Sequence, residues 1–549
     1  GETFRSTGDA AVLLRCLALQ GHAAVPALRG MFAFASWNAA RRTLLLARDP
    51  LGIKPLYIAR CTDRSRGWSL AFASEVRALL ASGLLGRPAL DPSAVASVVW
   101  NGFVVGPHTA VQGVESVSPG QLRLYGDDGA ETLVQDYWKL PPAGGSAATD
   151  EEQLAVQLEE SVRLHLASDV PLGVFLSGGI DSSAVANLAH RASRGPVHTF
   201  TLAFEEEEFN EGRIARRVAE AIGAEHQEVL LTEAYFVEQL DRALDSIDQP
   251  TFDGLNAFVM SRAVRDAGFT VALVGTGGDE LFGGYSSFRD LPAFHAWSRR
   301  LGFIPRAALV EGAQLAVAAL QPERGPMPRQ TRWAKLPEMV RRGDDLLSLY
   351  QLAYAQFLPE FQSELLEDPS WALVDGLPPA ARTRLHREIQ DRSDLTALSV
   401  LEQRLFLGER LLRDNDAASM AASLEQRLPL VDQVMLQTVA GLPDDVRYQP
   451  VLRKAVLRRT GLRGLDPALF ERPKRGFVLP FDRWIRKGLS STIDETLGDP
   501  EALRRVGLRP GPVQRLWQAF REGGPGLYWS RVWALFVLVR WCTRHGVSR

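Results

Sequence analysis

The segment FLSGGIDSSAV, residues 175–185, decides the fold of this chain. An apolar stretch that predicts a strand ends at Ser177, two glycines follow, and a helix is predicted to begin directly after them. Gly178 and Gly179 allow the main chain to approach an anion closely, and the helix start points free N–H groups at that anion. A turn capped by Asp181 is the alternative, and the two glycines alone would favour it. The strand before the glycines and the helix after them favour a loop that binds pyrophosphate.

The same loop indicates which phosphate group reacts. It lacks the Gly-Lys-Ser or Gly-Lys-Thr ending of the common nucleotide loop, so transfer of a γ-phosphate is disfavoured. The hydroxyl groups of Ser182 and Ser183 add hydrogen-bond donors to the loop. We expect the Asp181 carboxylate to hold a magnesium ion, because this cation prefers oxygen ligands.

Outward from this loop, short apolar runs alternate with segments of helix length. The runs lie at 173–177, 197–204, 226–231 and 271–275. This alternation predicts βαβ units and a buried parallel sheet. From about residue 290 to residue 549 the apolar spacing is mostly helical, as in 398–412. We therefore expect a doubly wound α/β domain with added helices.

The N-terminal part has the pattern of short strands and turns. Apolar runs at 31–37 and 43–49 flank a polar turn, which predicts a β-hairpin, and 56–60 with 69–75 repeats the pattern. Residues 141–149, PPAGGSAAT, lack charge and periodicity, as a linker does. The predicted parts are a first domain over 1–140, a linker over 141–150 and a second domain over 151–549.

Composition and charge exclude several classes of protein. The 549 residues are 46% hydrophobic and 23% charged, which excludes disorder throughout the chain. Lys plus Arg number 62 against 65 for Asp plus Glu, a net charge of −3, so no basic field points to nucleic acid. Three widely spaced cysteines without a CxxC pair argue against disulfides and structural zinc, and favour a reducing cytoplasm. The apolar run 533–539 is too short to span a membrane.

A second glycine cluster, VALVGTGGDELFGGY at 271–285, also follows a predicted strand. A flexible loop without a ligand is the less favoured alternative. SGGIDS at 177–182 matches the loop of the ATP pyrophosphatase family, and 271–285 resembles the corresponding stretch of glutamine-dependent asparagine synthetases. The first resemblance implies cleavage of ATP between the α- and β-phosphates, so that the substrate is adenylated and not phosphorylated.

The resemblance also implies a set of site residues. Asp181 and Asp279 would share the magnesium ion, and Gly275 and Leu202 would line the adenine and ribose. The implied ATP-binding residues are Phe175, Ser177, Gly178, Gly179, Asp181, Ser182, Ser183, Leu202, Val274 and Gly275. The implied cofactors are ATP and Mg²⁺.

Lysine is scarce in this chain, and two lysines fall in segments that resemble late motifs of the family. Lys454 lies in RKAVLRR, 453–459, and Lys474 lies in RPKRGFVLPFDRW, 472–484. Adenylation needs a point charge near the departing pyrophosphate, so both lysines are predicted to be catalytic, against the alternative that they are surface lysines. NDAASMAASLEQRLPLVD, 415–432, resembles a further family segment, although its spacing alone predicts an ordinary core helix and turn.

The first domain resembles the later half of a class II glutamine amidotransferase domain, at 28–59 and 72–75. The resemblance implies a partial αββα fold of the Ntn type and assigns Asp9 to the amino group of glutamine. The family's nucleophile is an N-terminal cysteine, whereas residue 1 is Gly, and the two cysteines of this domain are better explained as structural. We therefore expect the nucleophile-bearing start to be missing and the chain as given not to hydrolyse glutamine.

These resemblances predict an ATP-dependent amidoligase of the asparagine synthetase type. A carboxylate, most simply that of aspartate, would form an acyl-adenylate, and ammonia, supplied by glutamine in a complete protein, would displace AMP. Thr276 departs from the family, which often has Glu or Asp there, and threonine cannot act as a base at neutral pH. The alternatives are the same chemistry on a uronic acid of a surface polysaccharide or a specialised metabolite, and a nucleotide-binding remnant without activity.

The sequence gives less information about the residues that bind the acceptor carboxylate, and about the oligomeric state, than about the ATP loop. Asp248, Asp253 and Asn256 lie in a predicted loop and are equally well explained as solvent-facing turn residues. We expect small-molecule substrates as partners, with no nucleic acid and no membrane. A homodimer stays open, because nothing in the sequence encodes an oligomeric state.

Overall fold

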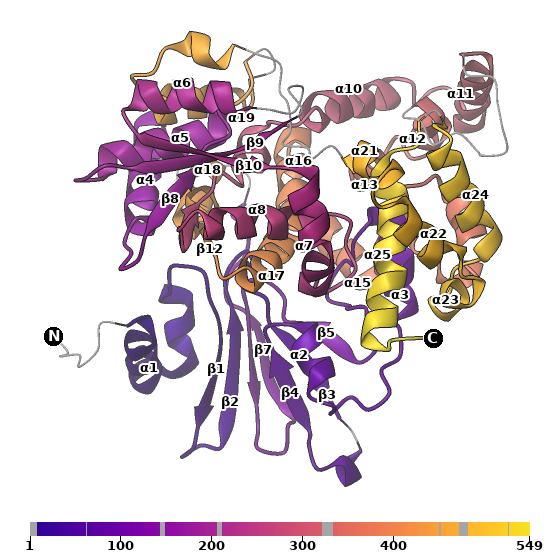
Figure 1. The fold of residues 1–549 in the computed structure, drawn as a ribbon, viewed down its shortest axis with the longest axis horizontal. Coiled ribbons are helices and arrows are strands. Elements are labelled where there is room, and N and C mark those ends of the chain that lie inside the picture. Colours follow the sequence, from indigo (N-terminus) through magenta and orange to yellow (C-terminus); the bar gives the residue numbers. More distant parts are fainter. Residues whose placement is uncertain are drawn as a thin grey trace.

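The computed structural model describes residues 8–61, 63–142, 149–205, 211–320, 333–449, 452–471, 481–524 and 526–549. Figure 1 shows the strands of the N-terminal part at the bottom, a sheet between helices at the upper left, and a group of helices at the right. Antiparallel sheets precede a parallel sheet along the chain. The predicted mixed α/β fold is confirmed.

Two antiparallel sheets form the core of the N-terminal part. The first has the strand order β1-β2-β6-β7 and the second has the order β4-β3-β5. Their strands are β1 (Ala33–Asn38), β2 (Thr43–Arg48), β3 (Tyr57–Arg60), β4 (Leu70–Ala73), β5 (Val114–Ser116), β6 (Gln121–Tyr125) and β7 (Glu131–Asp136). Both predicted hairpins, β1–β2 and β3–β4, form. Leu46, Ile58 and Tyr125 are buried in one cluster, so the two sheets pack face to face.

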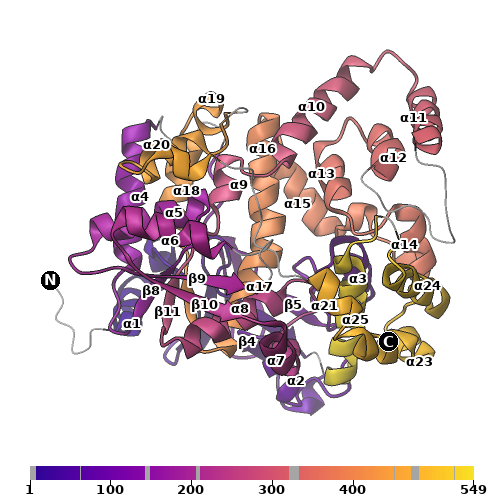
Figure 2. The same cartoon turned by 45° about the horizontal axis from the view of Figure 1, so that its top comes forward.

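Three helices accompany these sheets: α1 (Asp9–Gln20), α2 (Val76–Ala81) and α3 (Pro92–Asn101). The Asp91 side chain caps α3 by accepting the Ser93 N–H at 2.8 Å. At the other end of α3, the Trp100 indole donates to the Gln351 carbonyl at 3.1 Å, and the Asn101 amide donates to a second distant carbonyl. Although α3 belongs to the N-terminal part by sequence, it packs among the C-terminal helices (Figure 2).

Within the described residues, one stretch at 9–27 is long and apolar enough to pass a test for a membrane-spanning helix. Gly21, with φ 61°, follows the last residue of α1, and residues 21–27 form a 3-10 helix that contains Pro26. The 12 residues of α1 extend about 18 Å at about 1.5 Å per residue, short of the roughly 30 Å hydrocarbon core of a bilayer. The geometry of α1 therefore does not fit a continuous span.

The second part of the chain contains a five-stranded parallel sheet with the order β10-β9-β8-β11-β12. Its strands are β8 (Leu172–Phe175), β9 (His198–Phe204), β10 (Glu225–Leu231), β11 (Val271–Leu273) and β12 (Glu425–Arg427). The four apolar runs in the sequence become β8 to β11. The short strand β12 was not predicted, because its three residues are polar. In this order β9 lies on one side of β8 and β11 lies on the other, so the strand order reverses between β8 and β11. In sheets of this kind, ligands bind beyond the carboxyl ends of the two strands at that point.

Helices cover both faces of this sheet, as expected for a doubly wound domain (Figure 1). On one face lie α4 (Glu151–His165), α5 (Ile180–Ala192), α6 (Gly212–Ile222), α18 (Gln433–Ala440) and α20 (Ala455–Gly461), which share one apolar core. On the other face lie α7 (Glu233–Ser246), α8 (Gly254–Asp266) and α17 (Arg413–Ala421). Asp150 and Gln153 form a capping box at the start of α4. This capping box fixes the N-terminal end of the first helix in the second part of the chain.

The remaining helices lie mostly in the group at the right of Figure 1, but α19 lies at the upper left and contacts α20. They are α9 (Gly278–Phe282), α10 (Ser287–Arg300), α11 (Arg306–Leu320), α12 (Leu336–Arg341), α13 (Leu346–Tyr354), α14 (Pro359–Leu365), α15 (Pro379–Ile389), α16 (Asp394–Leu401), the π-helix η6 (Glu402–Leu412), α19 (Asp444–Arg447), α21 (Phe481–Arg486), α22 (Ser490–Gly498), α23 (Pro500–Arg505), α24 (Pro510–Arg521) and α25 (Trp529–His545). One apolar core contains residues of α3, α7, α8 and α25, so it joins this group to the sheet domain.

A buried carboxylate organises the turn after β2. Asp49, which is fully buried, accepts the N–H groups of Leu51, Ile53 and Lys54 at 3.2, 2.9 and 2.8 Å. The neighbouring Arg48 guanidinium donates to three backbone carbonyls of the same region. The polar groups of this turn are therefore satisfied within the protein, which fixes the path from the first sheet to the second.

Replacing this carboxylate tests its contribution to stability. Asp49→Ala leaves three amide groups without their acceptor, so we expect a loss of about 2–4 kcal/mol in the free energy of unfolding. Urea unfolding followed by circular dichroism measures this loss. Asp127→Ala is the control, because Asp127 makes an exposed ion pair with Arg42, and we expect little effect on the free energy of unfolding. Equal losses in the two variants would contradict this role of Asp49.

Candidate active site

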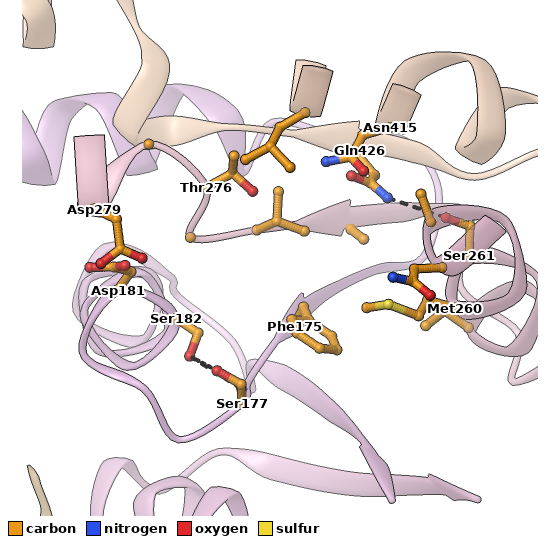
Figure 3. A pocket seen from close by; sticks show the side chains of 18 of the residues that line it. Phe175, Ser177, Asp181, Ser182, Met260, Ser261, Thr276, Asp279, Asn415 and Gln426 are labelled. Carbon is orange, nitrogen blue, oxygen red and sulfur yellow. Dashed lines mark hydrogen bonds between the residues drawn. The ribbon is translucent and has the colours of Figure 1, made fainter. Parts of the chain in front are cut away.

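A pocket of about 340 Å³ opens at the predicted point, beyond the carboxyl ends of β8 and β11. Figure 3 shows Asp181 and Asp279 facing each other at one end of it, near Ser177 and Ser182. Met260, Ser261, Asn415 and Gln426 lie at the opposite end, with Phe175 and Thr276 between them. The pocket therefore joins an acidic end to an end lined by amide, hydroxyl and thioether groups.

The loop between β8 and α5 has the geometry that the sequence predicted. Gly178 has φ 69°, a conformation that favours glycine, and a Cβ atom there would lie 2.9 Å from Ile214 Cγ2. The Ser177 and Ser182 hydroxyl oxygens lie 3.0 Å apart, and the Ser177 N–H donates to Ser182 Oγ at 3.2 Å. Helix α5 begins immediately after Gly179, so its first N–H groups are directed to the pocket end of the loop.

The second glycine loop packs directly onto the start of α5. A Cβ atom on Gly275 would lie 2.7 Å from both the Asp181 carbonyl carbon and the Ser182 nitrogen. A Cβ atom on Gly278 would overlap the Asp181 carboxylate, and one on Gly284 would overlap Asp279 Oδ1. These three positions are glycine because two main chains and two carboxylates approach closely there.

Lys454 joins the two carboxylates. Its ammonium group is ion-paired with Asp181 Oδ2 and lies 2.5 Å from Asp279 Oδ1. Burial alone would lower the pKa of Lys454, but the charges of Asp181 and Asp279 raise it above its usual value. Lys454 has φ 54°, unusual for a side chain other than glycine, and it directly precedes α20. The structure therefore brings together three of the predicted site residues in one charge cluster.

The donor set at this end fits a magnesium ion that is bound largely through phosphate. Two carboxylates already share one cation, the Lys454 ammonium. Among the described residues no group of three or more His, Cys, Asp or Glu side chains could hold a metal. Mg²⁺ characteristically uses one or two carboxylates and completes its shell with water and substrate phosphates. Asp181 and Asp279 match that requirement.

The predicted ATP-binding residues fall into three groups. The lining of the pocket includes Phe175, Ser177, Asp181, Ser182, Val274 and Gly275. Gly178 and Gly179 belong to the loop beside it, whereas the side chains of Ser183 and Leu202 are buried away from the lining. Asp9 is exposed at the start of α1 in the N-terminal part, and Lys474 lies outside the described residues. The assignments of all these residues to ligands stay predictions.

Sequence reasoning missed the far end of the pocket. Gln426 Nε2, on β12, donates to Ser261 Oγ, on α8, at 3.2 Å, and both residues line the pocket with Met260 and Asn415. Of the three acceptor candidates, Asp253 and Asn256 line the pocket, whereas Asp248 is buried elsewhere and accepts the Arg77 N–H at 3.1 Å. Besides these two candidates, the segment 415–432 contained a sequence signal for this wall, and no individual residue stood out in it.

Two buried carboxyl groups lie behind the acidic end. Burial and the charge of Asp279 raise the pKa of Glu280 to about 8, and Tyr285 Oη donates to Glu280 at 2.7 Å. Burial raises the pKa of Glu402 to about 7, even though Ser287 and two tyrosines donate hydrogen bonds to it. Both carboxyl groups therefore keep their protons to a higher pH in the folded protein than an exposed glutamate does.

Comparison with known proteins identifies the two parts of the chain. Residues 153–543 match the family model for asparagine synthase, and residues 1–138 match the model for a glutamine amidotransferase domain. The chain belongs to the asparagine synthase family. It is a ligase of the asparagine synthetase type, and its reaction class is ATP-dependent amidation.

Relatives of this asparagine synthase family member carry more than one name. A Mycobacterium tuberculosis protein, named as a candidate glutamine-hydrolysing asparagine synthetase, is 30% identical over 98% of this chain and 80% of its own length. Glutamine-hydrolysing asparagine synthetase 1 of Bacillus subtilis is 29% identical over 90% of this chain and 74% of its own length. Amidase chyE of Penicillium rubens is 26% identical over 88% of this chain and 74% of its own length.

The contact between the glycine loops gives a prediction about ATP. Gly275→Ala forces the loop away from α5, so we expect ATP affinity to fall by about tenfold or more while the protein stays folded. Isothermal titration calorimetry with ATP and magnesium measures the affinity. Gly195→Ala is the control, because a Cβ atom on Gly195 would meet nothing within 4 Å. Unchanged ATP affinity in Gly275→Ala would show that this contact does not shape the nucleotide site.

The raised pKa of Glu402 gives a prediction about pH. The folded protein holds the proton of Glu402 up to about pH 7, against an ordinary pKa of 4.5 in the unfolded chain. The stabilisation from this proton is complete below about pH 4.5 and is lost as pH rises through about 7. Glu402→Gln keeps a neutral group, so its stability should exceed that of the wild type by up to about 3 kcal/mol at pH 8, with little difference near pH 4.5. A difference that does not change with pH in urea unfolding would contradict the raised pKa.

Proposed function

We propose that this protein amidates a carboxylate through an acyl-adenylate, most simply converting aspartate and ammonia into asparagine with release of AMP and pyrophosphate. The observation that carries the proposal is the charge cluster of Asp181, Asp279 and Lys454 beside the loop 177–179. A helix start and the hydroxyl groups of Ser177 and Ser182 suit the phosphates of ATP, and a buried ammonium suits the charge that develops as pyrophosphate departs.

The proposed reaction has two steps. An oxygen of the acceptor carboxylate attacks the α-phosphorus of ATP, the bond to the bridging oxygen breaks, and pyrophosphate leaves with that electron pair. Ammonia then attacks the acyl carbon of the adenylate, AMP leaves, and a proton is lost from the new amide nitrogen. Bound Mg²⁺, held by Asp181 and Asp279, would supply positive charge to the phosphate oxygens.

Most of the predicted residues have a place in this scheme. Lys454 would hold the departing pyrophosphate, and Lys474 is predicted to act beside it. Phe175, Val274 and Gly275 would surround the adenosine, whereas the side chain of Leu202 is buried behind the pocket lining. The chemistry needs no cysteine in the synthetase part, so ammonia serves as nitrogen donor whether or not glutamine is hydrolysed.

We further propose that ammonia enters from the side of the first domain. The helix α17 and the edge strand β12 of the parallel sheet lie on the side of the second part that faces the first domain (Figure 1). The Lys54 ammonium of the first domain is paired with Asp416 of α17 at 2.6 Å, and Asn415 on the same helix lines the pocket. The far end of the pocket is therefore the end that a nucleophile from the first domain would reach. We also propose that the enzyme is located in the cytoplasm. A measurement of its molar mass in solution would show whether it forms a homodimer.

A second acceptor class is favoured by one observation. Thr276 lines the pocket between its two ends, where an acidic residue would be expected for an asparagine synthetase. The Penicillium relative carries the name amidase, so related chains have been named for other amide chemistry. We propose a uronic acid or a specialised metabolite carboxylate as the alternative acceptor.

Pyrophosphate release tests the proposal directly. The protein is incubated with ATP, magnesium and ammonium, with aspartate or with a panel of other carboxylates, while pyrophosphate and the amide product are measured together. We expect acceptor-dependent pyrophosphate with an equal amount of amide. Lys454→Met should lower the rate by about 100-fold or more, because it removes the ammonium between the two carboxylates.

Lys487→Met is the matched control, because Lys487 is an exposed lysine of the same domain, and its rate should equal that of the wild type. Asparagine formed in step with pyrophosphate would identify aspartate as the acceptor. Turnover with another acid alone would support the second acceptor class. ATP binding without turnover on any acid would overturn the proposed activity.

A further inference from the structure

A second cavity, of about 710 Å³, lies between the first domain and the helices of the second part. We call it the interdomain cavity. Its first-domain wall includes Gln121 of β6, Asp136 of β7 and Trp138 beyond β7. Its other wall is formed by the last turns of α15, the segment that follows α15, and Arg404 of η6. A ligand here would touch both parts of the chain, outside the pocket at the edge of the parallel sheet.

The interdomain cavity is lined by an excess of positive charge. Its lining includes five cationic and three acidic side chains, which leaves two positive charges in excess. The cations are Lys139, Arg384, Arg387, Arg392 and Arg404, and the acids are Asp136, Glu388 and Asp391. Arginine is well suited to oxyanions, because its planar fork donates two parallel hydrogen bonds to phosphate or carboxylate.

The acids in the cavity do not neutralise these cations one by one. Glu388 is engaged by Arg404, which donates to its two oxygens at 2.7 and 3.0 Å. Arg384 Nε lies 4.0 Å from the same carboxylate, and this buried atom has no hydrogen-bond partner among the residues that the structure describes. Arg392 donates to two backbone carbonyls, at 2.7 Å in each case. Within the described part of the chain, Arg387 and Lys139 make no ion pair.

Burial and neighbouring arginines oppose the charge of two arginines at this wall. Burial lowers the pKa of Arg404; the Glu388 charge acts against this, and the Arg384 charge adds to it. Burial likewise lowers the pKa of Arg392, against the effect of Glu388 and together with smaller effects of Arg447 and Arg404. Guanidinium groups that repel one another at a cavity wall are stabilised when an anion occupies the cavity.

We propose that the interdomain cavity is a binding site for a small oxyanion with two negative charges, a phosphate group or a dicarboxylate, distinct from the ATP pocket. Arg384 and Arg387 hold the anion from α15, and the side chain of Lys139 approaches from the linker side. Because the ligand lies between the two parts of the chain, binding it strengthens their contact. The proposal concerns this cavity alone and does not depend on which carboxylate the enzyme amidates.

Titration calorimetry of the full chain, without ATP, tests the site with inorganic phosphate and succinate as probes. We expect one saturable site, with affinity that falls as salt rises. The double variant R384Q/R387Q should bind at least about tenfold more weakly, and R387Q alone should bind severalfold more weakly. R387Q cannot fail through lost packing, since Arg387 is exposed and forms no ion pair within the described residues. R504Q is the matched control, an exposed arginine of α23 without an ion pair among the described residues, and it should bind as the wild type does.

The outcomes separate the ligand classes and the alternatives. Tighter binding of phosphate than of succinate would identify a phosphate site, and the reverse order would identify a dicarboxylate site; both support the proposal. Equal binding by the wild type, R387Q and R384Q/R387Q would overturn it. Binding that is lost in Gly275→Ala but retained in R384Q/R387Q would also overturn it, because the anion would then occupy the ATP pocket.

Discussion

The close approach of two main chains at the edge of the parallel sheet is the constraint on which the site depends. The loop after β11 contacts the first turn of α5 at a distance that excludes a side chain on Gly275. That contact places Asp279 opposite Asp181, although 98 residues separate them in sequence. Two carboxylates held this close repel each other unless a cation lies between them. The position of Lys454 is therefore required by the glycine contact and is not an independent feature.

The same constraint explains why α20 packs where it does. Lys454 directly precedes α20, which lies against α5, so its ammonium enters the acidic end from the same face of the sheet that carries Asp181. The left-handed backbone at Lys454 turns the chain sharply into the helix. Lys454 is a strained residue, and two ion pairs fix its side chain. Such an arrangement is typical of a site in which a charged group is held in position before the ligand binds.

The geometry of the acidic end of the pocket could be predicted from sequence because each of its parts is local, and the binding of ATP there stays a prediction. A strand, two glycines and a helix start occupy consecutive positions at 173–185, and the same order of strand, glycines and helix start occurs at 271–285. The strand β12 could not be predicted, because Glu425–Arg427 has no apolar signal and forms only by pairing with β11. The packing of α3 among C-terminal helices could not be predicted either, because the apolar residues of a helix show that it is buried but not which helices it packs against.

The acceptor end could not be predicted, for a related reason. Its wall combines α8, β12 and α17, three elements that meet only in the folded chain, and its polar groups are amides and hydroxyls that are common on any surface. None of the described residues that line this pocket is a lysine, arginine or histidine. The side chains of Asn256, Asn415 and Gln426 line this part of the pocket and could donate hydrogen bonds to polar groups of the proposed acceptor. Members of one family can therefore keep the ATP end unchanged and differ in acceptor through this wall.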